Sequence, residues 1–434
     1  MFRHSPPRKK KEAQKREGAA KMPPQAMREE EGLKPDLRII SDIKFPMQGM
    51  QGTVFFFRDG AGREMVAKLC EQEGALQREH FGATFIRNMH SERVGAPESE
   101  LHRTGDETFT ALKAALAEWT EEENAAMAFG AMAEYKGSHL LLMEKMAGVP
   151  YYPIPEEFGG NRTVLDSLAD ENTGLALGEV AFYDLLLGNI DRIIASLNPY
   201  NMLYQAPEAG KAMRINAIDS AFSVFGQKFG IDRFAPELVG ERARRIQDFS
   251  RSFSVRSGDV DDQDWEMVEY GAPHSDRQFD AKKDKDRLEE LLQASTTDRD
   301  KHRELSRYAE NILEKMLEPA VQEILTITLV GDPGNSRLAR SVATQFEKVC
   351  QANVPRHLLD LGAVKGYMTL VKRLKDPEFT DKLVTMTSGG MGREASGLLR
   401  NLYQVSSPYL ESASYSVLEK KVEQVQKKFL KRKK

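Results

Sequence analysis

The earliest clear pattern along the chain is a pair of short β-rich runs. Residues 53–57 (Thr-Val-Phe-Phe-Phe) and 64–69 (Glu-Met-Val-Ala-Lys-Leu) are separated by an Asp-Gly dipeptide at 59–60, which is typical of tight turns. This arrangement predicts a β-hairpin. An apolar run at 139–143 suits a buried strand, and a further extended segment is expected near 99–103.

Helical periodicity dominates the remainder of the chain. Strand signals become sparse after about residue 235, and apolar residues recur at helical spacing in several long stretches. The stretches predicted to be helical are 74–89, 109–135, 165–188, 284–326, 336–375 and 413–430. Residues 144–148 are interpreted as a linker between the strand at 139–143 and the helical part.

These elements predict an α+β fold with two lobes. A small β-rich N-lobe with one prominent helix is followed by a large, mainly helical C-lobe and a helical C-terminal extension. The expected parts are a disordered basic tail (1–34), the N-lobe (35–146), the core of the C-lobe (147–250), a helical region (251–417) and a second basic tail (418–434).

Composition indicates the class of protein and the cellular compartment. The chain has 434 residues, of which 40% are apolar, enough to fill a substantial core. No apolar run approaches the ~18–20 residues of a membrane span, and the N-terminus has no secretory apolar region. The two cysteines, Cys70 and Cys350, are far apart, which disfavours a disulfide framework and favours the reducing cytoplasm. Nuclear targeting and a secreted effector are the open alternatives.

The net charge of −4 conceals an uneven distribution of charge. Residues 1–34 carry ten Lys or Arg against five Glu, and residues 418–434 carry eight against two. The body between these ends is acidic, which argues against a nucleic-acid-binding fold as a whole. The tails are interpreted as solubilising disordered segments, or alternatively as contacts for nucleic acid, anionic lipid or an import receptor.

Three polar residues near the middle of the chain are the best candidates for chemistry. Asp191 follows an apolar helix and a break at Gly188-Asn189; Asn201 lies ten residues later, and Asp219 eighteen residues after that. A carboxylate on a tight loop can orient a hydroxyl, while an amide and a second carboxylate supply oxygen ligands for Mg²⁺. The short apolar runs beside Asn201 and Asp219 predict a hairpin with both side chains at one mouth. ATP-dependent phosphoryl transfer needs this set of groups.

Residues of the N-lobe can complete such a site. Lys68 ends the second hairpin strand, where its ammonium can neutralise two ATP phosphates. Glu79, eleven residues on, can hold Lys68 in place, with Glu73 as a competing partner. Backbone N–H groups of the turn Gly49–Gly52 can cradle phosphate oxygens. Alone, each feature also has an ordinary explanation as a surface or turn residue, but the ordered set is harder to obtain by chance.

This ordered set resembles the atypical kinase superfamily, and most closely the catalytic domain of actin-fragmin kinase, which is related to the phosphoinositide 3/4-kinases. The resemblance covers roughly residues 40–250. It lies in the segments Val66–Lys68, Gly95–Pro97, Gly188–Arg192, Asn201–Leu203 and Ile218–Asp219. The resemblance implies a two-lobed protein-kinase-like fold that binds ATP and Mg²⁺.

The resemblance also implies a role for each matching residue. Asp191 would be the catalytic aspartate, Asn201 and Asp219 the metal ligands, Lys68 the α/β-phosphate ligand, and Glu144 to Met146 the adenine-contacting hinge. The chain lacks His-Arg-Asp and Asp-Phe-Gly motifs, and Asp191 and Asn201 are ten residues apart where ordinary protein kinases have about five. The insertion 193–200 is either part of substrate recognition or a longer loop, and Asn198 is an alternative metal ligand.

Two glycine-containing segments compete with this interpretation. Gly390–Ala395 matches the pattern Gly-x-Gly-x-x-Ala, but only about forty residues follow it, too few for the further βαβ units of a dinucleotide fold. We interpret it as a flexible loop. Gly331–Asn335 lacks the Gly-Lys-Ser/Thr end of a P-loop and is interpreted as a turn.

The sequence therefore predicts an ATP- and Mg²⁺-dependent phosphotransferase acting on a Ser or Thr hydroxyl of a protein substrate. Actin, or a protein associated with actin, is suggested as the substrate by the resemblance alone. The alternatives are a lipid substrate, transfer of AMP, an inactive kinase-fold scaffold that binds a partner through its helical C-terminal part, and a protein whose basic tails dominate its function.

Overall fold

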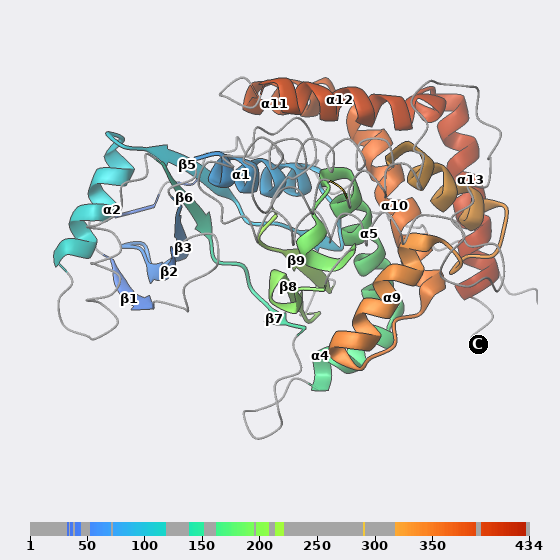
Figure 1. Ribbon diagram of the computed structural model, residues 1–434, viewed down its shortest axis with the longest axis horizontal. Coiled ribbons are helices and arrows are strands. Elements are labelled where there is room, and N and C mark those ends of the chain that lie inside the picture. The colour runs from blue at the N-terminus through green and yellow to red at the C-terminus, as the bar shows by residue number, and fades with distance from the viewer. Residues whose placement is uncertain are drawn as a thin grey trace, which may run out of the picture.

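The computed structural model describes a sheet-containing lobe and a helical lobe (Figure 1). The described residues are 33, 35–37, 40–44, 53–70, 73–118, 139–151, 162–194, 197–207, 213–220, 290, 317–387 and 392–430. The N-terminal tail, the Gly49–Gly52 turn and most of the helix predicted over 284–326 lie outside them.

The first lobe is built on a five-stranded antiparallel sheet. Its strand order is β1-β2-β3-β6-β5, with neighbouring strands paired antiparallel throughout. The strands are β1 (Ser41–Lys44), β2 (Thr53–Arg58), β3 (Glu64–Leu69), β5 (Ser99–Arg103) and β6 (His139–Glu144). The hairpin predicted over 53–69 and the strand predicted over 139–143 are confirmed.

Apolar side chains alternate between the two faces of this sheet, as the period of a strand requires. Phe55, Phe57 and Leu142 face one side, where they pack with Phe109 and Leu112 of helix α2 (Glu107–Glu118). The other face is covered by helix α1 (Glu73–Asn88). Its cluster contains Val66, Cys70, Leu76, Leu141 and Met143. Both faces of the central strands are therefore buried.

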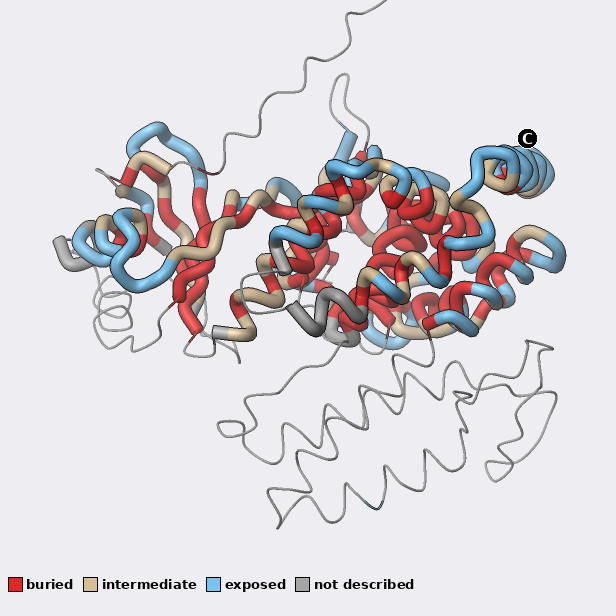
Figure 2. Tube along the Cα trace, turned by 90° about the horizontal axis from the view of Figure 1, so that it is seen from above, coloured by how far each residue is buried: buried red, intermediate tan, exposed pale blue. Residues whose placement is uncertain are grey.

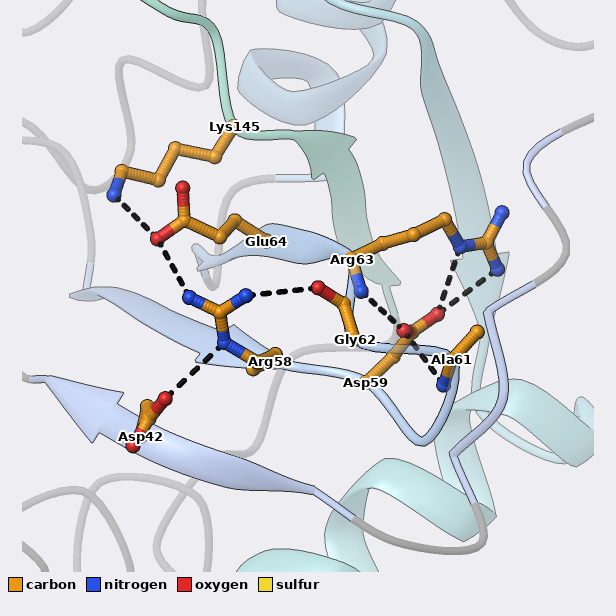
Figure 3. A network of polar contacts seen from close by, with 8 residues as sticks. All are labelled: Asp42, Arg58, Asp59, Ala61, Gly62, Arg63, Glu64 and Lys145. Carbon is orange, nitrogen blue, oxygen red and sulfur yellow. Dashed lines mark hydrogen bonds and ion pairs between the residues drawn. The ribbon is translucent and has the colours of Figure 1, made fainter.

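Asp59 closes the β2–β3 hairpin (Figure 3). Its carboxylate accepts hydrogen bonds from the backbone N–H groups of Ala61 and Arg63, at 3.0 and 2.8 Å, and from the Arg63 guanidinium at 3.0 Å. It also accepts from the backbone of Asp36 at 3.2 Å, which ties the incoming chain to the turn. The Asp-Gly signal in the sequence thus marks a turn that the aspartate side chain itself stabilises.

A second, smaller sheet lies at the start of the helical lobe. Its order is β4-β9-β8-β7, with β4 parallel to β9 and the other pairs antiparallel. The strands are β4 (Val94–Gly95), β7 (Val149–Pro150), β8 (Met202–Gln205) and β9 (Arg214–Ala217). The β8–β9 hairpin is the one expected after Asn201.

The helical lobe is organised around one central helix pair, α5 (Glu171–Leu187) and α10 (Arg356–Leu374). Around them lie α4 (Arg162–Asp166), the helical residues 317–329, α9 (Arg337–Cys350), α11 (Pro377–Thr387), α12 (Gly392–Ser406) and α13 (Ser412–Leu430). Figure 2 shows the buried residues concentrated along the central helices and in the sheet. A small antiparallel-sheet lobe followed by a large, mainly helical lobe is a two-lobed, protein-kinase-like α+β fold.

Several helix predictions need correction. The stretch 336–375 is two helices, α9 and α10, interrupted at Gln351–Pro355 because Gln351 is left-handed (φ 52°) and Pro355 precedes α10. The stretch 165–188 divides into α4, a 3₁₀ turn and α5. Gly390–Ala395 is not a flexible loop throughout, since α12 begins at Gly392. Of the helix predicted over 109–135, the described part ends at Glu118.

The helix predicted over 413–430 is confirmed, so the part of the predicted basic tail that the structure describes, 418–430, is helical. Helix α13 continues to Leu430, and its Leu418 and Val422 are buried in the large-lobe core. These contacts explain why a lysine-rich segment is helical rather than a disordered tail. Among the helices described, none is both long enough and apolar enough to cross a membrane.

Glycines allow α5 and α10 to approach closely. A Cβ atom added at Gly178 would lie 2.1 Å from the Leu359 carbonyl oxygen, and one added at Gly362 would lie 2.1 Å from the Leu175 carbonyl oxygen. Both contacts are with backbone, which cannot rotate away as a side chain can. The centre of the large lobe therefore depends on the absence of side chains at these two positions.

We expect the Gly178→Ala substitution to lower the free energy of unfolding by about 1–3 kcal/mol or more, because the new methyl group forces α5 and α10 apart. Thermal and urea unfolding of the two proteins measure the difference. Gly362→Ala should have a similar effect from the opposite helix. Wild-type stability in both variants would contradict this tight packing.

Candidate active site

The centre of the candidate site is the ammonium group of Lys68 on β3. Its Nζ atom lies 2.5 Å from Oε2 of Glu79 on α1 and 3.0 Å from Oδ1 of Asp219, just beyond β9. These partners are 11 and 151 residues away in the sequence. The fold thus brings three of the residues singled out in the sequence into direct contact. The side chain of Glu73, the competing partner, is not among those described.

Electrostatics make this contact a strongly coupled cluster. Burial opposes the charged form of Lys68, but the carboxylates of Asp219 and Glu79 outweigh it and raise the pKa of the lysine. The Lys68 ammonium lowers the pKa of Asp219, against the effect of burial. Burial raises the pKa of Glu79 to about 7, although Lys68 pulls it down. At neutral pH, Lys68 and Asp219 are therefore held in their charged forms.

Asp219 and Asn201 lie at the same end of the β8–β9 hairpin. The Ile218 N–H donates to the Asn201 carbonyl oxygen at 3.0 Å, which continues the hairpin pairing beyond its last strand residues. Asp219 follows at once with a left-handed backbone (φ 52°), a conformation that aspartate tolerates better than most residues. The chain therefore turns sharply where the carboxylate is presented to Lys68.

Asn198 has a structural function of its own. Its side-chain oxygen accepts a hydrogen bond from the Tyr200 N–H at 3.2 Å and so caps the 3₁₀ turn Pro199–Asn201. That turn belongs to the insertion noted in the sequence and leads directly into β8. The Asn198 side chain therefore has a local structural partner of its own.

The loop that carries Asp191 begins with a sharp helix end. Gly188 is left-handed (φ 62°), and its N–H bonds back to the carbonyl groups of Asp184 and Leu185, a common way to terminate a helix. A short π-helical turn, Ile190–Ile194, follows. The backbone of Asp191 lies in this turn, whereas its side chain is not among those described. The π-turn geometry was not anticipated, and such turns occur frequently at functional sites.

Beside this loop lies a buried ion pair that the sequence did not reveal. The guanidinium of Arg192 is fully buried; it lies 3.1 Å from the Asp184 carboxylate on α5 and donates to the Ser220 hydroxyl at 2.7 Å. Asn189 also donates to the Asp184 carboxylate at 3.3 Å. Burial raises the pKa of Asp184 to about 7, with Arg192 opposing the shift. Arg192 therefore joins α5, the Asp191 loop and the residue after Asp219.

The hinge segment Glu144–Met146 connects the two lobes. The Glu144 carboxylate accepts from Arg87 of α1 at 3.2 Å, and Lys145 pairs with Glu64 at 3.0 Å. Glu64 also contacts Arg58, so that a chain of charges runs from the hinge across the sheet (Figure 3). The Glu144 side chain is thus engaged with α1.

The oxygen donors at the hairpin end fit a hard cation. Among the residues described, no three His, Cys, Asp or Glu side chains are grouped as a metal centre. An ionised Asp219 carboxylate and the Asn201 amide oxygen are nevertheless the ligand types that Mg²⁺ accepts when substrate phosphates and water complete its shell. The residues present are compatible with such a nucleotide-bound metal.

Comparisons with known proteins add little to this geometry. No protein-family model and no curated protein matches the chain. Matching solved structures include the proinflammatory kinase CtkA of Helicobacter pylori, with 11% identity and a TM-score of 0.27 over 75% of this chain and 96% of that one. They also include MAP kinase LmaMPK10 of Leishmania major, with 12% identity and a TM-score of 0.19 over 88% and 95%. The fold assignment therefore rests on the strand order and lobe packing described above.

The buried ion pair predicts a large effect of removing one partner. Arg192→Met keeps an apolar stem but leaves the Asp184 carboxyl without its cation, so the free energy of unfolding should fall by about 3–5 kcal/mol. Urea denaturation followed by circular dichroism measures this loss. The double variant Arg192→Met/Asp184→Leu leaves no unpaired buried charge, only the loss of the neutral hydrogen bonds to Ser220 and Asn189, and should recover much of it. An equal loss in the single and double variants would contradict a role for the ion pair.

The raised pKa of Asp184 predicts a pH dependence with a definite sign. Its pKa in the folded protein, about 7, lies above the ordinary 3.8, so its stabilising contribution is complete below 3.8 and is lost as the pH rises through about 7. Asp184→Asn removes this loss. Between about pH 5 and about pH 8, the free energy of unfolding of the wild type should therefore fall relative to that of the variant. Parallel stability curves would show that Asp184 does not titrate in this range.

Proposed function

We propose that this protein is an ATP- and Mg²⁺-dependent phosphotransferase that transfers the γ-phosphate of ATP to a Ser or Thr hydroxyl of a protein substrate. One observation carries the proposal: the Lys68 ammonium lies between Glu79 and Asp219, which come from a helix and a hairpin far apart in the sequence. Phosphoryl transfer in kinases depends on a lysine–glutamate pair of this kind beside an aspartate that holds the metal.

In this proposal, the large lobe supplies the metal ligands and the group that positions the hydroxyl. Asn201 and Asp219 would hold Mg²⁺, which when bound neutralises charge on the transferring phosphate. Asp191 would accept or orient the substrate hydroxyl proton, and Arg192 would hold its loop against α5 and Ser220.

The small lobe would bind the nucleotide. Lys68, fixed by Glu79, would contact the α- and β-phosphates, and the glycine turn with Gly49 and Gly52 would cover the phosphates. The hinge, from Glu144 to Met146, would contact the adenine. These assignments place the phosphates at the junction of the two lobes, where β3, α1 and the β8–β9 hairpin meet.

We also propose a kinase class and a first substrate to examine. The resemblance of Gly188–Arg192 and Asn201–Leu203 to the actin-fragmin kinase catalytic domain supports an atypical kinase and offers actin, or an actin-associated protein, as the first substrate to examine. The same metal clamp could instead stabilise transfer of AMP, because either displacement places charge on metal-bound phosphate oxygens.

The direct test incubates the purified protein with labelled ATP, Mg²⁺ and a cell extract, beside an Asp191→Ala variant. A labelled protein band that depends on Asp191 would support a kinase, and the intact mass of the product distinguishes an added phosphate from an added AMP. Labelled lipid in place of protein would change the substrate class. If neither wild type nor variant labels anything while Asp191→Ala still performs the cellular function, the kinase fold acts as a binding scaffold.

The charged cluster predicts which substitutions abolish turnover. Asp219→Ala and Lys68→Ala should each lower kcat by about 10²–10³-fold or more, since each removes a charge aimed at the phosphates. The measurement is Mg²⁺-dependent release or transfer of labelled phosphate. The exposed residues Asp381 and Lys113 provide matched controls, because their alanine variants remove the same charges far from the cluster. Normal turnover in Asp219→Ala would disprove its assignment to the metal.

A further inference from the structure

Helix α1, which carries Glu79, belongs to the cores of both lobes. Near its N-terminus, Leu76 packs in the cluster beneath the five-stranded sheet. Further along, Phe81, Phe85 and Ile86, and Met89 just after the helix, are buried in the large-lobe core. In Figure 1, α1 extends from the sheet into the helical lobe and lies below α11, which it contacts. The helix therefore cannot move with the small lobe alone without exposing apolar side chains.

Two contacts restrain the middle and the end of α1 further. A Cβ atom at Gly82 would lie 1.8 Å from the Ser220 carbonyl oxygen, so the helix backbone lies directly against the residue that follows Asp219. At its last turn, Arg87 pairs with Glu98 and with Glu144 of the hinge, both at 3.2 Å. These contacts join α1 to the hairpin end and to the hinge.

The C-terminus of α1 is held by an arginine from the large lobe. Arg373, in the last turn of α10, donates from Nε to the carbonyl oxygen of Asn88, the final residue of α1, at 2.8 Å. Helix ends leave such carbonyl groups without a partner in the helix, and a guanidinium is a strong donor to them. The donor and acceptor are 285 residues apart, and the bond links a helix that begins beneath the small-lobe sheet to the central helix α10 of the large lobe.

The guanidinium of Arg373 is itself fixed in place. It pairs with Asp376 at 2.7 Å and lies over the ring of Phe379, whose centroid is 5.1 Å away. The Phe379 ring in turn packs against Phe85 of α1, with 6.3 Å between ring centroids. If Arg373 stabilised only the end of α10, its ion pair with Asp376 would be sufficient. Arg373 also donates a hydrogen bond to the end of α1.

We propose that Arg373 is a positioning residue: by anchoring α1 to α10 and α11, it holds Glu79 against Lys68 and keeps the site assembled. For its effect on catalysis the proposal rests on the phosphotransferase function proposed above; for the geometry of Lys68 it does not. In this proposal, the helical region after residue 317 has a function: it holds α1, the helix that carries Glu79, in position. The Lys68–Glu79 pair is then a permanent feature, formed without an activating partner.

The test compares Arg373→Met, Arg373→Lys and Lys372→Ala in the full chain. Arg373→Met keeps an apolar stem over Phe379 and removes the hydrogen bond to α1, and Arg373→Lys restores a single cationic donor. Lys372→Ala removes the exposed neighbouring charge and serves as the control. The first measurement is acylation of Lys68 by an amine-directed reagent without nucleotide, quantified by peptide mass spectrometry relative to Lys365 of α10.

Lys68 should react several-fold faster in Arg373→Met, at a rate near wild type in Lys372→Ala, and at an intermediate rate in Arg373→Lys. The second measurement is the steady-state kinetics with ATP, from which kcat and KM are each obtained. In Arg373→Met we expect the ratio kcat/KM for ATP to fall by about tenfold, and we expect Arg373→Lys to restore part of it. Unchanged Lys68 reactivity in a folded Arg373→Met protein would overturn the proposal. So would an equal rise in reactivity at Lys365, since that would indicate general loosening.

Two outcomes need separate treatment. If the wild type transfers no phosphate, the proposed function fails, but the Lys68 reactivity still decides whether Arg373 positions α1. If Arg373→Met does not fold, Asp376→Asn replaces it, because it leaves Arg373 in place and removes the charge of the ion pair that orients it, while the asparagine oxygen can still accept from the Glu378 N–H at the start of α11. An intermediate rise in Lys68 reactivity would then support the proposal, and wild-type reactivity would overturn it.

Discussion

The assembly of this molecule depends on one buried cation. Removing a lysine ammonium from water is costly by several kcal/mol unless opposite charges surround it. Lys68 meets that requirement only when β3, α1 and the end of the β8–β9 hairpin are all in place, because Glu79 and Asp219 come from the last two. The lobes are therefore joined by an electrostatic requirement as well as by apolar packing.

A second buried cation, Arg192, is held in the same way, and it contacts the residue that directly follows Asp219. Lys68 contacts Asp219, while Arg192 contacts Ser220 and reaches Asp184 on the central helix α5. The left-handed backbone at Asp219 separates the directions of these neighbouring side chains. Two adjacent residues thus connect one segment to the small lobe and to the centre of the large lobe. A short segment fixed in this way suits a group that must be held rigidly toward a ligand.

The sequence predicted those parts of the site whose spacing follows from local structure. The Asp-Gly turn placed Lys68 at the end of a strand, and the paired apolar runs placed Asn201 and Asp219 at one end of a hairpin. The Asp184–Arg192 pair was missed because Asp184 lies in an apolar helix, and nothing local indicates that a guanidinium approaches it. The break at Gln351–Pro355 could have been predicted from its proline, whereas α12 was missed because its first residues are rich in glycine.

Because of the position of α1, the boundary between the lobes in the structure does not coincide with a single point in the sequence. By sequence, a boundary after residue 146 is reasonable, since a linker follows the last strand of the sheet. In the structure, however, Phe81, Phe85 and Met89 from the part before that boundary are buried in the core of the part after it. Separated at 146, the small lobe would expose these side chains and lose Arg373, the donor to its Asn88 carbonyl oxygen. Since the free energy of burial scales with apolar area, the lobes stabilise each other through this helix as well as through the pairing of β4 with β9, and the Lys68–Glu79 pair lies within the part that both share.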